Sequence, residues 1–351
     1  MPDTAGLPTL LQAWRDAKTG DPHARARDIA DKLGVPEGAL VEARTGEGIT
    51  RLTTRGEDAI PLLSALTGLG PVMTLTRNQA AVHETTGPMG EVAAHGLMGQ
   101  VTGDIDLRMF LRHWHVVYAI SEEARSGLRH SIQIFDVTGQ SVIKIYATDE
   151  TDMASWRALI EGHRDSSTAL TTFSPPVASR PDAPDDEIDA NVLRREWLTL
   201  QHSHDFHKML RELGIGRAQA LRLAGDDLAR RIPVEAVETI LRGAADQQIP
   251  IMCFVGNPGC IQIFSGPISR IEPMGPWLNV LDPGFNLHLR TDRVATVWMV
   301  RKPTEMRGDI TSVELYDDGG ELVCQFFGAR PPGEGERPAW RALVQKIGGA
   351  A

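Results

Sequence analysis

The amino-acid sequence predicts an α+β protein made by tandem duplication of one domain, in which each copy has a large antiparallel sheet flanked by helices. Two observations lead to this prediction. Several segments of the chain occur twice, about 180 residues apart, which indicates a duplicated domain. Within each copy, apolar residues first follow a helical period, then alternate as in strands, and then return to a helical period. Strands grouped together and flanked by helices are typical of the α+β class.

The repeat is carried by five pairs of segments, which occur in the same order in both copies. The last pair is identical, Trp-Arg-Ala-Leu in each copy. The spacing between paired segments drifts slowly along the chain, as small insertions after a duplication would produce. The pairs, first copy and then second, are 32–35 and 212–215, 84–88 and 263–267, 106–108 and 286–288, 131–139 and 312–320, and 156–159 and 340–343.

Each copy is expected to open with two helices, to continue into strands that fold back as a hairpin, and to close with a helix. A glycine separates the opening helices, Gly34 in the first copy and Gly214 in the second. Asp and Gly mark the hairpin turns, and Trp156 or Trp340 lies in the closing helix. The expected helices are 24–32, 37–44, 206–213 and 217–232, and the expected hairpins are 130–147 around 136–139 and 311–328 around 317–320.

The chain has 351 residues, more than the roughly 250–300 that one hydrophobic core usually serves. A stretch rich in Pro, Asp and Ser separates the copies, and we expect it to be an extended connector. The sequence therefore predicts an N-terminal repeat at 1–170, a connector at 171–189 and a C-terminal repeat at 190–351.

The composition excludes several classes of function. Lys and Arg number 36 against 46 Asp and Glu, and the net charge of −10 argues against general nucleic-acid binding, which needs a basic surface. No apolar run approaches the ~18 residues of a membrane span, and the N-terminal stretch lacks the pattern of a secretory signal. Three scattered cysteines suit a reducing compartment. We expect a cytoplasmic protein that is not inserted in a membrane.

The segment 197–210 contains three of the 11 histidines of the chain and is expected to form one helix. His204 and His207, three residues apart, would share a face of that helix. They could be ordinary surface or core histidines, zinc ligands or ligands of heme iron. A structural zinc site usually needs four ligands with cysteine among them, and no two cysteines are closely spaced. A single histidine is enough to hold heme iron from one side.

Six segments of the chain form a specific combination. They are 197–207, 256–263 (Gly-Asn-Pro-Gly-Cys-Ile-Gln-Ile), 277–283, 285–290, 300–304 and 325–328 (Gln-Phe-Phe-Gly). Together they resemble the hemin-degrading factors of bacterial heme uptake, the HemS, HmuS and ChuS type, and the resemblance covers nearly the whole chain. It implies two similar sheet-and-helix halves and heme b, as substrate or cargo, in a cleft beside the second half.

The resemblance also implies roles for individual residues. His204 matches the proximal ligand of the heme iron, and His207 matches a second histidine thought to offer alternative ligation. Arg108, in the segment Asp-Leu-Arg-x-Phe, matches the distal arginine and is the expected catalytic residue, with Phe110 among the heme contacts. The positions that resemble contacts to the heme propionates are Arg217, Lys302, Gln325 and Arg330.

Simpler interpretations of some of these residues stay open. Arg108 could form an ordinary surface salt bridge. Arg217 would stand in an early turn of a helix, where the dipole disfavours a cation, so it needs a partner. Cys324 occupies a position where some family members have tyrosine, and His202 has no assigned role. His288 takes the place of the distal arginine in the second copy, which suggests one heme per chain.

The implied pocket suits two functions. In the first, the protein oxidatively degrades hemin and releases iron, using O2 and an electron donor, while the protein orients the heme. In the second, a trafficking chaperone receives heme from an ABC-type uptake transporter and hands it to a separate heme oxygenase. We expect degradation and keep trafficking as the alternative. A two-domain interaction module without a cofactor is a third hypothesis, which a Soret band on addition of hemin would exclude.

Overall fold

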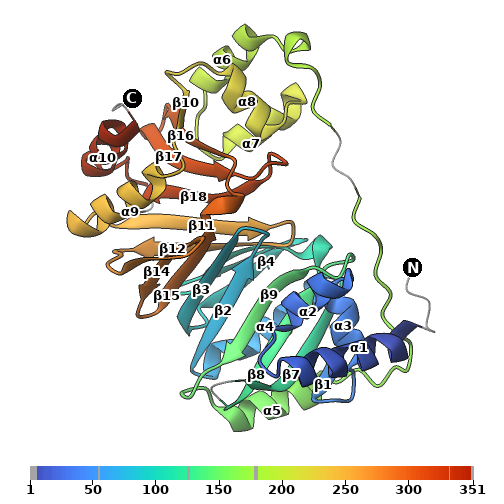
Figure 1. The fold of residues 1–351 in the computed structure, drawn as a ribbon. Helices are drawn as coiled ribbons and strands as arrows, with labels where there is room; N and C mark the ends of the chain where they lie inside the picture. The colour runs from blue at the N-terminus through green and yellow to red at the C-terminus, as the bar shows by residue number, and fades with distance from the viewer. Residues whose placement is uncertain (1–5, 54–55, 125–126, 178–180, 332, 349–351) are drawn as a thin grey trace. The chain divides into compact units, whose positions relative to one another are not determined.

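The computed structural model of the protein describes residues 6–53, 56–124, 127–177, 181–331 and 333–348. The chain divides into two compact units (Figure 1). The first unit contains Met1–Arg77, Glu84–Ala178 and Gly256–Gln262, and the second contains Asn78–His83, Ser179–Val255 and Ile263–Ala351. Residues 178–180 of the predicted connector lie outside the described residues.

The first unit combines helices with antiparallel strands. Its helices are α1 (Leu7–Gly20), α2 (Ala26–Leu33), α3 (Glu37–Ala43), α4 (Ala59–Ala65) and α5 (Met153–Gly162). Its strands are β1 (Ile49–Leu52), β2 (Pro71–Arg77), β4 (Glu91–His95), β5 (Met98–Thr102), β6 (Asp106–Phe110), β7 (Val116–Ala124), β8 (Gly127–Phe135) and β9 (Ser141–Ala147), with the end of β3 (Ala81–Pro88) and the start of β12 (Cys260–Gly266). The strand orders are β1-β7-β8-β9-β2-β3 and β12-β6-β5-β4.

The second unit repeats this plan. Its helices are α6 (Ala190–Leu198), α7 (Asp205–Leu213), α8 (Arg217–Leu223), α9 (Ala236–Asp246) and α10 (Pro338–Gly348). Its strands are β10 (Ala229–Ile232), β11 (Ile251–Asn257), β13 (Ile271–Met274), β14 (Trp277–Asp282), β15 (Phe285–Arg290), β16 (Thr296–Thr304), β17 (Gly308–Tyr316) and β18 (Leu322–Gly328), with the start of β3 and the end of β12. The strand orders are β10-β16-β17-β18-β11-β12 and β3-β15-β14-β13.

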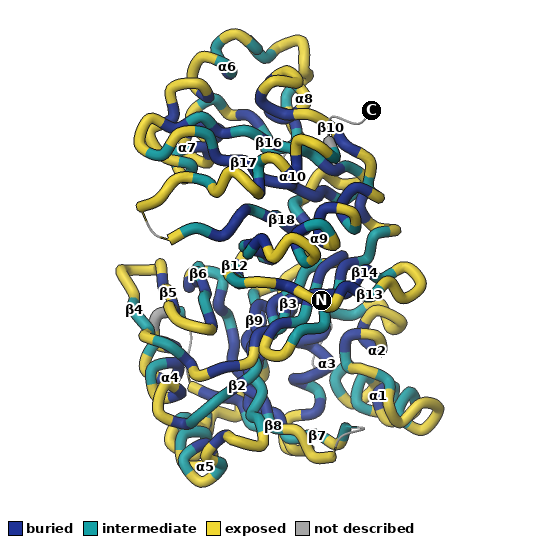
Figure 2. Tube along the Cα trace, turned by 90° about the vertical axis from the view of Figure 1, so that its left-hand side faces the viewer, coloured by how far each residue is buried: buried dark blue, intermediate teal, exposed yellow. Residues whose placement is uncertain are grey.

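Helices cover both faces of the larger group of strands in each unit. In the second unit, Val297 and Met299 of β16 pack with α9 and α10, whereas Trp298 and Val300 pack with α6, α7 and α8. This alternation follows from the two-residue period of a strand. In the first unit, α4 and α5 pack on one face and α3 on the other. Burial is accordingly concentrated in the strands, and the outer faces of the helices are exposed (Figure 2).

Each unit contains one short turn segment from the other half of the chain, and the two turns are equivalent. Asn78, before β3, accepts two backbone N–H groups of its own turn and donates through Nδ2 to the carbonyl oxygen of Val323 at 2.8 Å, within the second unit. Asn257, before β12, does the same in the first unit, where its Nδ2 donates to the carbonyl oxygen of Val142 at 2.8 Å. The limits 1–170 and 190–351 given above for the repeats stay a prediction.

The expected α+β class, with two large antiparallel sheets flanked by helices, is confirmed. The glycines that end α2 and α7 both have left-handed backbones, with φ of 66° at Gly34 and 65° at Gly214, where glycine carries no steric penalty. The predicted hairpins are β8–β9 and β17–β18. The closing helices α5 and α10 bury Trp156 and Trp340.

Two expected helices are wrong in extent. The stretch 197–210 is not one helix, because α6 ends at Leu198 and α7 starts at Asp205. The carboxylate of Asp205 accepts the backbone N–H of His202 at 2.8 Å, which stabilises a new helix start instead of a continuous helix. The expected helix 217–232 ends at Leu223, and its last residues form β10.

Candidate functional site

The two candidate ligand histidines lie at the start of α7. His204 is the N-cap residue and His207 lies in the first turn, so they share one side of the helix even though the longer helix is broken. Trp197 of α6 holds this region in place. Its ring packs edge-on against Phe206 with 4.5 Å between centroids, and its Nε1 donates to the carbonyl oxygen of Arg301 at 3.0 Å.

Both imidazoles are exposed to solvent, yet the surrounding protein lowers their pKa values. For His204 the main cause is desolvation, followed by the positive charges of Arg307 and Arg330. Desolvation, then Arg217 and Lys302, lowers the pKa of His207 to about 4. Both rings are therefore neutral at pH 7, the form in which imidazole binds a metal ion.

His207 already has a partner for one ring nitrogen. Arg217 Nη1 lies 3.3 Å from His207 Nε2. A guanidinium can only donate, so Nε2 accepts and the proton of the neutral ring is on Nδ1. No described residue engages the His204 ring in this way, so that ring is the more available ligand of the two.

Arg217 finds the partner that its place at a helix start requires. Its guanidinium donates to both carboxylate oxygens of Glu314, at 2.9 and 2.8 Å, and to the Tyr316 hydroxyl at 2.8 Å. The ammonium of Lys302 donates to the same carboxylate at 2.7 Å. Glu314 is fully buried. We call Arg217, Lys302, Glu314 and Tyr316 the buried charge cluster.

The buried charge cluster has two cations and one carboxylate, which leaves one positive charge. Burial would raise the pKa of Glu314, but the charges of Arg217 and Lys302 outweigh it and hold that pKa well below its ordinary value. Burial lowers the pKa of Lys302 to about 8, with Glu314 opposing this shift. Both cations also lie 5.0 Å from the ring centroid of Phe206, so positive charge surrounds the first turn of α7.

The second unit therefore brings together four of the residues expected at a heme site, His204, His207, Arg217 and Lys302. Gln325 of β18 is the register partner of Glu314 on β17. Arg330 follows β18 and is close enough to His204 to lower its pKa. The roles expected for these residues stay predictions.

Two expected site residues, Arg108 and Phe110, lie on β6 of the first unit. The guanidinium of Arg108 forms an ion pair with Asp106 on the same strand and donates to the carbonyl oxygen of Leu107 at 3.0 Å. The Arg108 side chain remains 38% exposed, so it is accessible to a ligand. The backbone N–H of Phe110 donates to the carbonyl oxygen of Gly259 at 3.0 Å.

Sequence reasoning missed two groups at this site. Glu314 lies in the repeated segment 312–320, and a carboxylate in an otherwise apolar stretch, Ser-Val-Glu-Leu-Tyr, is a usable sign of a buried ion pair. Arg307 lies in the turn between β16 and β17, and nothing in its local sequence separates it from other exposed arginines.

Comparison with known proteins identifies the family. The family model described as the haemin-degrading HemS.ChuX domain matches twice, at residues 34–163 and 214–347. The chain belongs to the haemin-degrading HemS/ChuX family. The two matches also confirm the tandem repeat, because one HemS/ChuX domain model fits each copy.

Relatives of this family match over almost the full chain. The hemin transport protein HmuS of Yersinia pestis is 37% identical over 344 residues, covering 97% of each chain. Holo-PhuS, a heme-binding protein from Pseudomonas aeruginosa, has a TM-score of 0.92 and 44% identity, covering 97% of this chain and 98% of its own. The heme degrading enzyme ChuS of Escherichia coli O157:H7 has a TM-score of 0.89 and 34% identity, covering 97% and 99%. The expected resemblance is therefore confirmed.

Among the described residues, no helix combines the length and the apolar character needed to span a membrane.

Proposed function

We propose that this protein binds heme in its second unit and degrades it oxidatively, releasing the iron. The observation that carries the proposal is the pair of solvent-exposed imidazoles, His204 and His207, kept neutral among cations. Porphyrin supplies four ligands to the iron, so one neutral imidazole completes the protein side of the site. The cations suit the two propionate carboxylates. Relatives of nearly the same length are a heme-binding protein and a heme degrading enzyme.

In this proposal His204 binds the iron, because its ring is not engaged by Arg217. For Arg108 of the first unit we propose a catalytic role as a hydrogen-bond donor, with Asp106 orienting its guanidinium. Ring opening is chemistry of the heme with O2 and electrons from a reductant. The protein contributes orientation and a polar distal group. We place this activity in the cytoplasm, downstream of an ABC-type heme transporter.

The test is absorption spectroscopy of the purified protein with one equivalent of hemin, first without and then with oxygen, in the presence of a reductant and catalase. Catalase removes free peroxide, which destroys heme without an enzyme. Loss of the Soret band together with chelatable iron supports degradation. A matched sample of Arg108→Ala should bind hemin and lose it more slowly. Equal rates would remove Arg108 from the mechanism.

Heme trafficking is the second candidate, and one observation favours it. His207 lies three residues from His204, and its ring is bonded to Arg217. A second ligand is therefore available during stepwise release. The hemin transport proteins among the relatives suit this function. A Soret band that is stable with reductant and oxygen, and moves only when a heme oxygenase is added, would select trafficking over degradation.

A further inference from the structure

The last part of the connector between the repeats is bound to α8. Gln219 of α8 is fully buried, and its Nε2 donates to the carbonyl oxygen of Ala183 at 2.6 Å and to the carboxylate of Asp185 at 2.8 Å. One turn further along α8, Arg222 forms an ion pair with the same carboxylate at 3.0 Å. Two side chains on one face of α8 therefore hold this part of the connector.

The connector also contacts the start of α8. A β-carbon at Gly216, the N-cap residue, would lie 2.1 Å from Asp182 Oδ1. The Asp182 carboxylate therefore fits against the helix start only because residue 216 has no side chain. Arg217 is the next residue in the chain. The contacts with the connector thus include the turn of α8 that carries Arg217.

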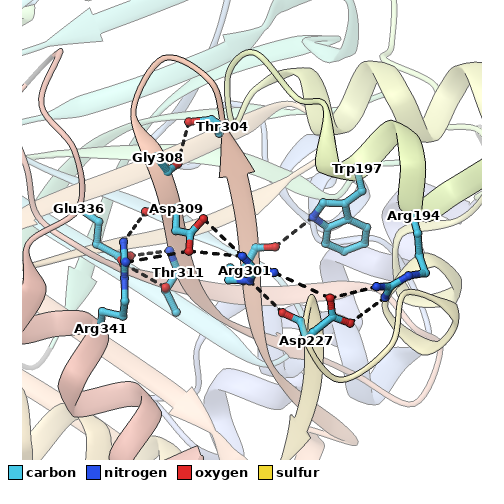
Figure 3. A network of polar contacts seen from close by, with 10 residues as sticks. All are labelled: Arg194, Trp197, Asp227, Arg301, Thr304, Gly308, Asp309, Thr311, Glu336 and Arg341. Carbon is cyan, nitrogen blue, oxygen red and sulfur yellow. Dashed lines mark hydrogen bonds and ion pairs between the residues drawn. The ribbon is translucent and has the colours of Figure 1, made fainter.

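The other end of α8 is fixed by a network of charges whose residues lie outside the connector (Figure 3). Arg194 of α6 donates to the carbonyl oxygen of Ala224, the C-cap residue of α8, and pairs with Asp227 at 2.7 Å. Arg301 of β16 donates to the carbonyl oxygen of Asp227 at 2.9 Å, and its Nη1 lies 3.4 Å from Asp309. The end of α8 is therefore joined to α6, β16 and β17, and the connector supplies contacts at its start.

The start of α8 bears on the candidate site because Arg217 reaches His207. The guanidinium of Arg217 makes three bonds of 2.8 to 2.9 Å within the buried charge cluster. Its fourth bond, from Nη1 to His207 Nε2, has a length of 3.3 Å, which is long for a hydrogen bond. A small displacement of Arg217 would break this bond before the others. The bond to His207 is therefore the contact most sensitive to the position of α8.

We propose that Gln219 is a positioning residue of this site. By holding residues 183–185 of the connector against α8, Gln219 keeps Arg217 bonded to His207. His204 then remains the ligand of the heme iron. This role rests on the proposed binding of heme and extends it to the connector, because a displaced connector would release His207 and change the iron ligation. The competing interpretation is that Gln219 only stabilises the fold.

The experiment compares Gln219→Leu with Gln262→Leu, a matched change in the first unit. Gln262 is also fully buried, and its Nε2 donates to the carbonyl oxygen and the hydroxyl of Thr74 at 3.2 and 3.0 Å. In both glutamines Oε1 has no hydrogen-bond partner among the described residues. Asp185→Ala is the third variant. It removes connector contacts at an exposed position, so it should fold even where Gln219→Leu does not.

Each variant is mixed with one equivalent of hemin, and ferric absorption and electron paramagnetic resonance spectra report the iron ligands. Chemical denaturation reports the stability. Gln219→Leu and Asp185→Ala are expected to give a mixture of His204-ligated and His207-ligated heme, and adding His207→Ala should restore a single component. Gln262→Leu is expected to lose free energy of unfolding as Gln219→Leu does, and to keep the wild-type spectrum.

Three results would overturn the role of Gln219. They are a wild-type spectrum in both Gln219→Leu and Asp185→Ala, a mixture that persists when His207→Ala is added, and an equal mixture in Gln262→Leu, which would indicate general destabilisation. The proposed function fails separately, when wild-type protein causes no change in the Soret band of hemin.

Discussion

The two units place opposite charges at the same point of the repeat. Glu37 begins α3 and Arg217 begins α8, each three residues after the glycine that ends the preceding helix. Glu37 pairs with Lys144 of β9, whereas Arg217 pairs with Glu314 of β17. Compared with the first unit, the charge at the helix start is reversed, and its partner comes from the neighbouring strand of the repeat. The repeated frame therefore tolerates either charge at this helix start, provided that the sheet supplies a counter-ion.

The surroundings of the two pairs differ. In the first unit one carboxylate pairs with one ammonium, and the positive charge of Arg77 acts on both. Burial lowers the pKa of Lys144, but Glu37 outweighs it and the pKa is raised. The second unit adds Lys302 and so keeps a positive charge. In the first copy Ala24 and Arg27 stand where the second copy has His204 and His207. At these two positions the second copy has imidazoles and the first copy has none.

The largest effect should follow from Glu314→Gln. It leaves Arg217 and Lys302 buried without their carboxylate, and the free energy of unfolding should fall by about 3–5 kcal/mol. Chemical denaturation measures the change. The matched variant Glu37→Gln removes the ion-pair partner of one cation, Lys144, and should destabilise less, because Arg77, among the described residues, forms no ion pair with Glu37 but only senses its charge. Equal losses of unfolding free energy in the two variants would show that the second cation paired with Glu314 does not add to the destabilisation.

Next in size is the loss of iron ligation. His204→Ala should still bind hemin, with a changed ferric spectrum, because His207 is three residues away. The double variant with His207→Ala should lose the imidazole-ligated spectrum. Ferric Soret maxima and electron paramagnetic resonance report the ligands directly. Wild-type spectra in the double variant would rule out both histidines.

A smaller, more specific effect is expected from Arg217→Met. Removing the donor frees His207 Nε2, so the ferric spectrum should become a mixture of His204-ligated and His207-ligated heme. Adding His207→Ala should restore a spectrum with a single component. Arg27→Met, a loss of one arginine in the first copy, is the control and should leave the spectrum unchanged. A change caused equally by both variants would indicate a general structural effect.

The smallest effect concerns pH. The folded-state pKa of His207, about 4, lies below its ordinary value of 6.5. As the pH falls, His207 is therefore protonated in the unfolded chain before it is protonated in the folded chain. The contribution of neutral His207 to the free energy of unfolding is fully present above about pH 6.5 and is lost as the pH falls through 4. The ring is exposed, so the change should stay below about 1 kcal/mol. His207→Gln should flatten the pH dependence of the denaturation midpoint in this range, and an unaltered slope would contradict the assignment.

The parts of the fold that depend on local chemistry could be predicted from sequence. Asp136 accepts the N–H groups of Thr138 and Gln140 in its turn, and the sequence around it predicted that hairpin. The break before α7 was missed, because the bond from His202 to Asp205 competes with a helical pattern that looks continuous. The early end of α8 was missed as well, although Gly225, with a φ of 88°, is a local signal for it.

The candidate site depended on contacts between residues far apart in the chain. The need of Arg217 for a partner could be inferred from its place in the helix, but not that the partner is Glu314, 97 residues away. The turn carrying Arg307 meets the histidine segment through backbone bonds, which have no signature in side-chain pattern. The family resemblance therefore indicated candidate site residues, and the structure shows which residues they contact.

The two exchanged turns, 78–83 and 256–262, supply hydrogen-bond partners to the units that contain them. Without 256–262, the first half would leave Trp114 Nε1 and the carbonyl oxygen of Val142 without the partners they have in Gly259 and Asn257. Without 78–83, the second half would lose the bond of Asn78 to Val323. Each unit is therefore completed by a short segment from the other half of the chain.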